Sequence, residues 1–253
     1  MAIDSAKVEV VGIPVSSTDL SLAVLDQALA EDQPLIVASV NPLGCAISRK
    51  HPQYTKDLAQ FDWVICDGIG MVIAARRIHR LPINRLTFDR TSLATPVLNW
   101  AARKGVEAVL VGAKPGIAQR AGELMVELTP GLKLARTFSG YNGDPALARE
   151  YLLNHPGKLV VCGMGSPRQE AFLLDLKQSG WKGIGFTCGG FLDQIVENVD
   201  YFPLWVNRMH VRFLYRIFKE PRRLWRRYLI DYQVFMGRFV KEYSAQVLGG
   251  KSP

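Results

Sequence analysis

The sequence predicts an α/β fold: a Rossmann-like, mostly parallel sheet flanked by helices, followed by a basic, aromatic helical C-terminal appendage. Two observations predict the sheet. Short apolar runs alternate with helix-like segments at spacings of about 25 to 30 residues, which is typical of βαβ units. The apolar runs are also continuous rather than alternating, as expected for strands that are covered by helices on both faces.

Seven strands are expected along the first four fifths of the chain, over residues 8–15, 35–39, 62–66, 106–111, 132–138, 159–162 and 183–188. Segments with apolar residues at helical spacing lie between them, for example residues 91–104 and 168–179. From residue 203 onward only helical periodicity remains. We therefore expect an α/β domain over residues 1–200 and a helical appendage over residues 201–253.

The composition is that of a soluble protein with one large domain. Its 253 residues are enough for a substantial core, and no apolar run approaches the ~20 residues that span a bilayer. The N-terminus lacks the basic and apolar regions of a secretory signal. The four cysteines form no CxxC pair, so we expect them to be small core residues in a reducing cytoplasm.

The appendage carries the whole net positive charge of the chain. Residues 1–200 hold 20 Lys and Arg against 20 Asp and Glu, whereas residues 201–253 hold 11 against 3. Apolar and aromatic residues recur there every three to four positions and trace one helical face. Such a face could contact a membrane, pack against the α/β domain or mediate self-association, and periodicity does not distinguish these alternatives.

Polar residues and glycines gather where the expected strands end. The candidates are Ser39, Asn41, Asp67, Gly163, Gly165, Gln169, Gly189, Gly190 and Asp193. The carboxyl ends of parallel strands share one edge of the sheet, where open α/β proteins bind ligands. We therefore expect these residues, although far apart in sequence, to line one crevice.

Several of these residues have a structural alternative. Asp67, at a strand exit among apolar residues, could act as a general base, or it could cap the following helix. Asn41, before a proline, could be only a turn residue. Residues 163–170 could be a plain strand-to-helix turn, in which Ser166 caps the helix and Gln169 completes a capping box.

No metal or cofactor site is predicted, because the chain has no Asp-x-Asp motif and its four histidines are scattered. Arginines at four-residue spacing in the appendage, such as Arg212 and Arg216, suit phosphate groups or an anionic membrane surface. A nucleic-acid-binding protein that uses the basic aromatic appendage is the alternative function. A nucleotide-dependent oxidoreductase ranks lower, because no G-x-G-x-x-G motif follows the first strand.

Four ordered motifs resemble those of the WecG/TagA/CpsF glycosyltransferases, which elongate lipid-linked sugars in bacterial cell-surface polysaccharide synthesis. They are Asp67-Gly68, GMGSPRQE at 163–170, GGFLD at 189–193 and LYRIFKEPRRLWRRY at 214–228. The resemblance covers nearly the whole chain.

The resemblance implies an inverting, metal-independent hexosyltransferase without a cofactor. It would move a sugar from a UDP-sugar to a polyprenyl-diphosphate-linked saccharide, in which the lipid carrier is undecaprenyl diphosphate. The enzyme would work as a peripheral protein on the inner, cytoplasmic face of the cell membrane. By similarity, Asp67 is the general base. The residues implied to line the pocket are Ser39, Asn41, Arg85 and Gln169, and those implied to bind the diphosphate are Arg216, Arg223 and Arg226. No nucleic-acid partner is implied, and a homo-oligomer is compatible with the appendage.

The sequence also departs from the usual family pattern. Leu43 stands where an acidic residue commonly follows Asn-Pro, and Phe88 stands in place of a glycine. Tyr201-Phe202-Pro203 and Arg212-Phe213 are further departures. These positions surround the expected sugar and acceptor sites, so they argue against assuming an N-acetylmannosamine donor.

Overall fold

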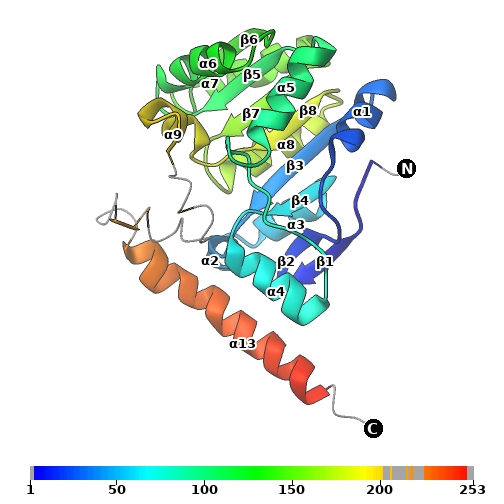
Figure 1. The fold of residues 1–253 in the computed structure, drawn as a ribbon, viewed down its shortest axis with the longest axis vertical. Helices are drawn as coiled ribbons and strands as arrows, with labels where there is room; N and C mark the ends of the chain where they lie inside the picture. The colour runs from blue at the N-terminus through cyan, green and yellow to red at the C-terminus, as the bar shows by residue number, and fades with distance from the viewer. Residues whose placement is uncertain (1–2, 202–205, 207–214, 216, 219–224, 250–253) are drawn as a thin grey trace.

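The computed structural model describes residues 3–201, 206, 215, 217–218 and 225–249. Its centre is a six-stranded sheet in the order β4-β3-β8-β7-β5-β6, in which every strand pairs in parallel with its neighbours. The strands are β3 (Leu35–Val40), β4 (Trp63–Cys66), β5 (Ala108–Gly112), β6 (Leu134–Phe138), β7 (Leu159–Gly163) and β8 (Ile184–Thr187). The predicted α/β fold with a parallel sheet is therefore confirmed (Figure 1).

The first expected strand, over residues 8–15, is wrong as a single element. The chain instead forms an antiparallel hairpin of β1 (Lys7–Val10) and β2 (Ile13–Ser16), in which Val10 pairs with Ile13. The two residues between them, Val11 and Gly12, both have positive φ angles of 48° and 74°. A two-residue loop with both φ angles positive turns the chain back tightly enough to close a hairpin.

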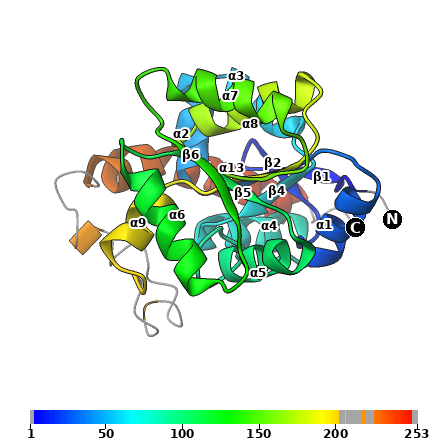
Figure 2. The same ribbon diagram turned by 90° about the horizontal axis from the view of Figure 1, so that it is seen from above.

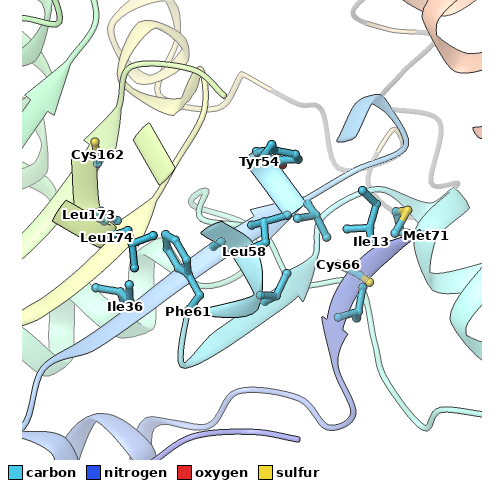
Figure 3. Close-up of a cluster of buried hydrophobic side chains, with 14 of the residues drawn as sticks. Ile13, Ile36, Tyr54, Leu58, Phe61, Cys66, Met71, Cys162, Leu173 and Leu174 are labelled. Atoms are coloured by element: carbon cyan, nitrogen blue, oxygen red, sulfur yellow. The ribbon is translucent and has the colours of Figure 1, made fainter. Parts of the chain in front are cut away.

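Helices cover both faces of the sheet, as Figure 2 shows for α7 and α8 on one side and α5 and α6 on the other. The helices are α1 (Leu22–Ala30), α2 (Leu43–Lys50), α3 (Gln53–Ala59), α4 (Ile69–His79), α5 (Ala94–Lys104), α6 (Ile117–Leu128), α7 (Asp144–Asn154), α8 (Arg168–Gln178), α9 (Phe191–Glu197) and α13 (Tyr232–Gly249). Consecutive strand residues point to opposite faces. Thus Leu35 and Val37 join the core under α1, α5, α6 and α9, whereas Ile36 and Ala38 join the core under α2, α3, α7 and α8. The core that contains Ile36 and Ala38 also includes Tyr54 and Leu58 of α3 (Figure 3).

The four cysteines are confirmed as small core residues, since all are buried and none forms a disulfide. Burial raises the pKa of the Cys45 thiol to about 11 and that of Cys66 to about 12. Burial also raises the pKa of Cys162 and Cys188. All four thiols are therefore protonated at neutral pH, and none is prepared to act as a nucleophile.

The C-terminal helix α13 is attached to the body by one side only. Phe235 is 5% exposed and lies over Gly70 at the start of α4. Arg238 donates hydrogen bonds to the Val11 carbonyl and the Ser48 hydroxyl, both at 3.1 Å, and the carboxylate of Glu242 accepts the Val11 N–H at 3.0 Å. Figure 1 shows this long helix running past α2 and α4 at one end of the molecule.

A flanking side of α13 is apolar and exposed, so the single face expected from the sequence is divided between two environments. Met236, Val240, Tyr243 and Val247 are 52%, 56%, 40% and 48% exposed, and their spacing of four, three and four residues places them in one row. We call this row the outer stripe of α13.

Because α13 docks through Phe235, substitutions at Phe235 and at its neighbour Met236 should change the free energy of unfolding by different amounts. Phe235→Ala should lower the free energy of unfolding by about 3 kcal/mol, because it removes a buried aromatic side chain and leaves a cavity against α4. Met236→Ala, on the outer stripe, is the matched control and should change it by less than about 0.5 kcal/mol. Denaturant unfolding measures both, and equal effects would contradict the docking of α13 through Phe235.

Candidate active site

The strand order brings the predicted site residues to one edge of the sheet. β4, β3, β8 and β7 are consecutive neighbours, and their carboxyl ends lead into Asp67, Asn41, Gly189 and Gly165 respectively. Adjacent strands lie about 4.8 Å apart, so these four exits span roughly 14 Å. The exits of β4 and β3 carry polar side chains, whereas those of β8 and β7 carry glycines.

Asp67 stands at the exit of β4 with its carboxylate accessible from outside. Its side chain is 35% exposed, and its Oδ1 lies 3.6 Å from Nη1 of Arg85, which approaches from the segment after α4. The helix-cap alternative does not hold, because the N-cap of α4 is Gly68 and that position has no side-chain cap hydrogen bond. The expected apolar enclosure is also wrong, since the carboxylate is partly open and paired with a guanidinium.

The exits of β3 and β4 touch each other. A side chain at Gly68 would place its Cβ 2.5 Å from Cδ of Pro42, so only glycine permits this approach. Asn41 accepts a hydrogen bond from the Leu43 N–H at 3.0 Å, which supports its role as a turn residue that starts α2. Asp67 and Asn41 are thereby fixed at adjoining turns.

Ser39, on β3, links the β4–β3 part of the sheet to the part that begins with β8. Its N–H donates to Oγ1 of Thr187 on β8 at 2.8 Å, and its hydroxyl donates to the Thr187 carbonyl at 3.4 Å. Sequence reasoning missed Thr187, although a threonine that ends an otherwise apolar run is a recognisable signal. Because it is completely buried, it acts by fixing the β3–β8 register rather than by meeting a ligand.

The turn after β7 differs from the predicted capping box. α8 begins at Arg168 with Pro167 at the N-cap, and no side chain caps it. The Ser166 hydroxyl instead donates to Oε1 of Glu170 at 2.7 Å, and the Gln169 amide donates to the same oxygen at 3.0 Å. Oε1 of Gln169 accepts the Gly189 N–H at 3.2 Å, which ties the turn of β7 to the turn of β8.

Close backbone contacts hold these turns in place. A Cβ at Gly112 would lie 2.4 Å from the Gly163 carbonyl carbon, and one at Gly163 would lie 3.0 Å from the sulfur of Cys188. Glycines are required where three strand exits crowd together in this way. Gly190 is the N-cap of α9, and Asp193 is exposed on the first turn of that helix.

The predicted diphosphate-binding arginines are only partly placed. Arg216 and Arg223 lie outside the described residues. Arg226 is exposed, and its guanidinium carbon lies 5.6 Å from the centroid of the neighbouring Trp225 ring. Within the described part of the chain, no group of three or more His, Cys, Asp or Glu residues is positioned to hold a metal ion. No helix among the described residues is both long and apolar enough to cross a membrane.

A groove of about 490 Å³ lies away from this edge, between the β1–β2 hairpin, α2, α3 and α13. It is lined by charges of both signs, and its arginine, Arg238, already binds Val11 and Ser48. The carboxyl edge of the sheet is therefore the stronger candidate for chemistry.

A sequence model of the glycosyl transferase WecG/TagA/CpsF family matches residues 8–247. The chain belongs to the WecG/TagA/CpsF family of glycosyltransferases. This decides against the nucleic-acid-binding and oxidoreductase alternatives, and it confirms the resemblance seen in the sequence motifs. The WecG/TagA/CpsF match includes both the sheet and α13, so the family definition extends over the body and the C-terminal helix together.

Several characterised proteins are similar to this WecG/TagA/CpsF chain. A "UDP-Gal:alpha-D-GlcNAc-diphosphoundecaprenol beta-1,4-galactosyltransferase" from Shigella boydii is 29% identical over 82% of this chain and 86% of its own length. An "N-acetylglucosaminyldiphosphoundecaprenol N-acetyl-beta-D-mannosaminyltransferase" from Bacillus subtilis (strain 168) is 26% identical over 77% of this chain and 75% of its own length. A protein of the same name from Staphylococcus aureus (strain MW2) is 22% identical over 94% of each chain.

Glu170 provides a test of the site's electrostatics by pH. Burial raises the pKa of its carboxyl above the usual 4.5, although the Ser166 and Gln169 hydrogen bonds act in the opposite direction. Above pH 4.5 the unfolded chain loses this proton while the folded protein keeps it, so the free energy of unfolding falls as the pH rises. Relative to Glu170→Gln, the wild-type melting temperature should therefore fall between pH 4 and pH 8.

A second carboxylate supplies the control with the opposite sign. The hydrogen bond from Lys158 lowers the pKa of Glu107. Relative to Glu107→Gln, the wild-type melting temperature should therefore rise as the pH increases toward the unfolded pKa of 4.5, and it should stay level above that pH. A wild-type protein that gains stability relative to Glu170→Gln with rising pH would show that Glu170 is ionised in the folded state.

Proposed function

We propose that this protein is an inverting glycosyltransferase that moves a hexose from a UDP-sugar to an undecaprenyl-diphosphate-linked saccharide. Family membership supports the reaction class, and the names of the relatives support the two substrates. The observation that carries the proposal is the half-exposed Asp67 carboxylate at the same edge as the turns of β7 and β8. The departures at Leu43 and Phe88, and a galactosyltransferase among the relatives, favour leaving the hexose open.

The proposed reaction is a single displacement at the anomeric carbon of the donor. Asp67 takes the proton from the acceptor hydroxyl as its oxygen forms a bond to that carbon. The bond from the carbon to the diphosphate oxygen breaks on the opposite side, and UDP leaves with the electron pair. The configuration at the anomeric carbon is thereby inverted.

The remaining site residues would position the donor. In this proposal Ser39, Asn41, Arg85 and Gln169 line the pocket. Gly163, Gly165, Gly189, Gly190 and Asp193 lie at the turns that follow β7 and β8, and they complete the binding surface for the donor. Backbone N–H groups at such turns suit anionic oxygens.

We also propose that no metal takes part, and that arginines of the appendage balance the charge of the departing UDP. The support comes from the sequence, which lacks an Asp-x-Asp motif and carries Arg216, Arg223 and Arg226 in a strongly basic segment. Fixed positive groups around a leaving diphosphate stabilise the transition state without a cation. On this proposal residues 1–200 form the catalytic domain and residues 201–253 complete its site.

The appendage is further proposed to rest on the cytoplasmic face of the cell membrane. The outer stripe of α13 presents apolar side chains to the outside, with Lys241 and Arg226 exposed nearby in sequence. A helix with such a stripe and basic flanks binds the interface of an anionic bilayer. The relatives act on diphosphoundecaprenol carriers, by their names, so a lipid surface is where the acceptor would be found.

Asp67→Asn tests the assignment of the base. We expect the turnover number with UDP-sugar and lipid-linked acceptor to fall by about 10³-fold, because the amide accepts no proton. UDP affinity, measured by calorimetry, should stay within about twofold. Asp175→Asn, which removes a surface carboxylate of α8, is the control and should keep full turnover. Wild-type turnover in Asp67→Asn would exclude this residue as the base.

The Arg216→Ala/Arg223→Ala double variant tests the role of the appendage arginines. Calorimetric titration with UDP should show that the wild-type protein still binds UDP when EDTA is present. The double variant should bind UDP at least about tenfold more weakly under the same conditions, because charge-assisted hydrogen bonds are lost. Arg120→Ala on α6 is the control. Binding that disappears with EDTA in the wild-type protein would contradict metal independence.

Met236→Ser/Val240→Ser tests the membrane surface. The fraction of protein that sediments with vesicles of anionic phospholipid should fall several-fold, whereas Leu128→Ser, at an exposed apolar position on α6, should leave it unchanged. Unchanged vesicle binding combined with loss of a dimer would assign the outer stripe to contact between two copies of the chain.

A further inference from the structure

The first turn of α8 buries a carboxyl group that the proposed reaction does not use. Glu170 is fully buried, and its neighbour Gln169 is only 2% exposed. The phenol of Tyr54, on α3, also interacts with Ser166 and Glu170. Burying an acid in such a place is costly, so a residue with an apolar side chain would suit the core better unless the carboxyl has a task.

The hydrogen bonds around Glu170 fix the orientation of one side-chain amide. Nε2 of Gln169 donates to Oε1 of Glu170 at 3.0 Å and to the Ser166 hydroxyl at 3.3 Å, while its Oε1 accepts the Gly189 N–H at 3.2 Å. The nitrogen of the amide therefore faces acceptors, and its oxygen faces a donor. A flipped amide would place like groups together on both sides, so only one orientation is compatible with both partners.

The two oxygens of Glu170 have unequal roles. Oε1 accepts from both Ser166 and Gln169, whereas Oε2 is buried and has no hydrogen-bond partner within the described part of the chain. Oε1 alone therefore makes the contacts that hold Ser166 and the Gln169 amide. A glutamine can reproduce the acceptor at Oε1, but alanine and leucine cannot.

We propose that Glu170 is a positioning residue for the donor site: it locks the Gln169 carboxamide, whose oxygen binds the Gly189 N–H and so holds the turn of β8 in the position that receives the UDP-sugar. The proposal rests on the proposed function, in which the turns that follow β7 and β8 line the donor pocket. Glu170 itself has no exposed atom to meet a ligand. It acts only through the turns of β7 and β8.

The kinetic test compares three substitutions. Glu170→Ala should raise KM for the UDP-sugar by about tenfold and leave KM for the lipid-linked acceptor unchanged, because only the donor turns lose their support. Glu170→Gln should restore donor KM to within about twofold of wild type. Leu174→Ala, a buried position on the same helix, should lower the melting temperature without changing donor KM.

A double-mutant cycle separates positioning from general destabilisation. Gln169→Ala should itself raise donor KM, and adding Glu170→Ala should raise it no further, because both residues act through the same amide. Additive effects in the double variant would overturn the proposal, as would a Glu170→Ala protein with wild-type donor KM. A Glu170→Gln protein as impaired as Glu170→Ala would also overturn it.

Amide hydrogen exchange gives a readout that does not depend on the reaction. Exchange at the Gly189 N–H should be at least about tenfold faster in Glu170→Ala than in wild type, and close to wild type in Glu170→Gln. Unchanged exchange in Glu170→Ala would overturn the positioning role. If the wild-type protein turned over no UDP-sugar, the proposed function would fail, while exchange at Gly189 would still decide whether Glu170 holds this turn.

Discussion

The candidate active site depends on the pairing of β3 with β8. These strands are about 150 residues apart in the chain, yet Leu35 pairs with Ile184 and Val37 pairs with Phe186. The bond between the Ser39 N–H and Oγ1 of Thr187 fixes their register next to the carboxyl edge. Without this pairing, the half of the sheet that carries Asp67 would not adjoin the half that carries Gln169.

The exits of these strands are then held by contacts that allow little variation. At Gly68, Gly112 and Gly163, an added Cβ would lie only 2.4 to 3.0 Å from an atom of a neighbouring turn, so the close packing depends on the absence of a side chain. The amide of Gln169 adds a polar bridge between two of the turns. A rigid edge of this kind suits a displacement reaction, because the base, the donor carbon and the leaving group must stay nearly in line.

Much of the sheet could be predicted from the sequence, because parallel strands buried on both faces leave continuous apolar runs. All six strands of the sheet match expected segments, and the convergence of Asn41, Asp67 and Gly189 on one edge follows from that fold. The hairpin at Val11-Gly12 was missed because its loop lacks the Asn-Gly or Asp-Gly signal of such turns. Helix α2 was missed because it begins directly after Asn41-Pro42, where a proline usually indicates a turn.

Other features depend on tertiary contacts that periodicity does not encode. The sequence showed one apolar face on the appendage, but the packing of Phe235 against Gly70 leaves Met236 and Val240 outside. The carboxylate of Asp67 was expected among apolar residues, whereas Arg85 approaches it from a segment nearly 20 residues later. Glu170 looked like an ordinary polar residue of a helix start, and only its complete burial indicates a specific role.

The account is tested most directly by mapping where a UDP-sugar binds. Amide hydrogen exchange of the wild-type protein, with and without a UDP-sugar, should show protection at residues 39–42, 67–68, 163–169 and 189–190. These segments are the exits of four neighbouring strands, so they should be protected together. Protection confined to the groove between the hairpin, α3 and α13, with none at these four exits, would contradict the assignment of the active site.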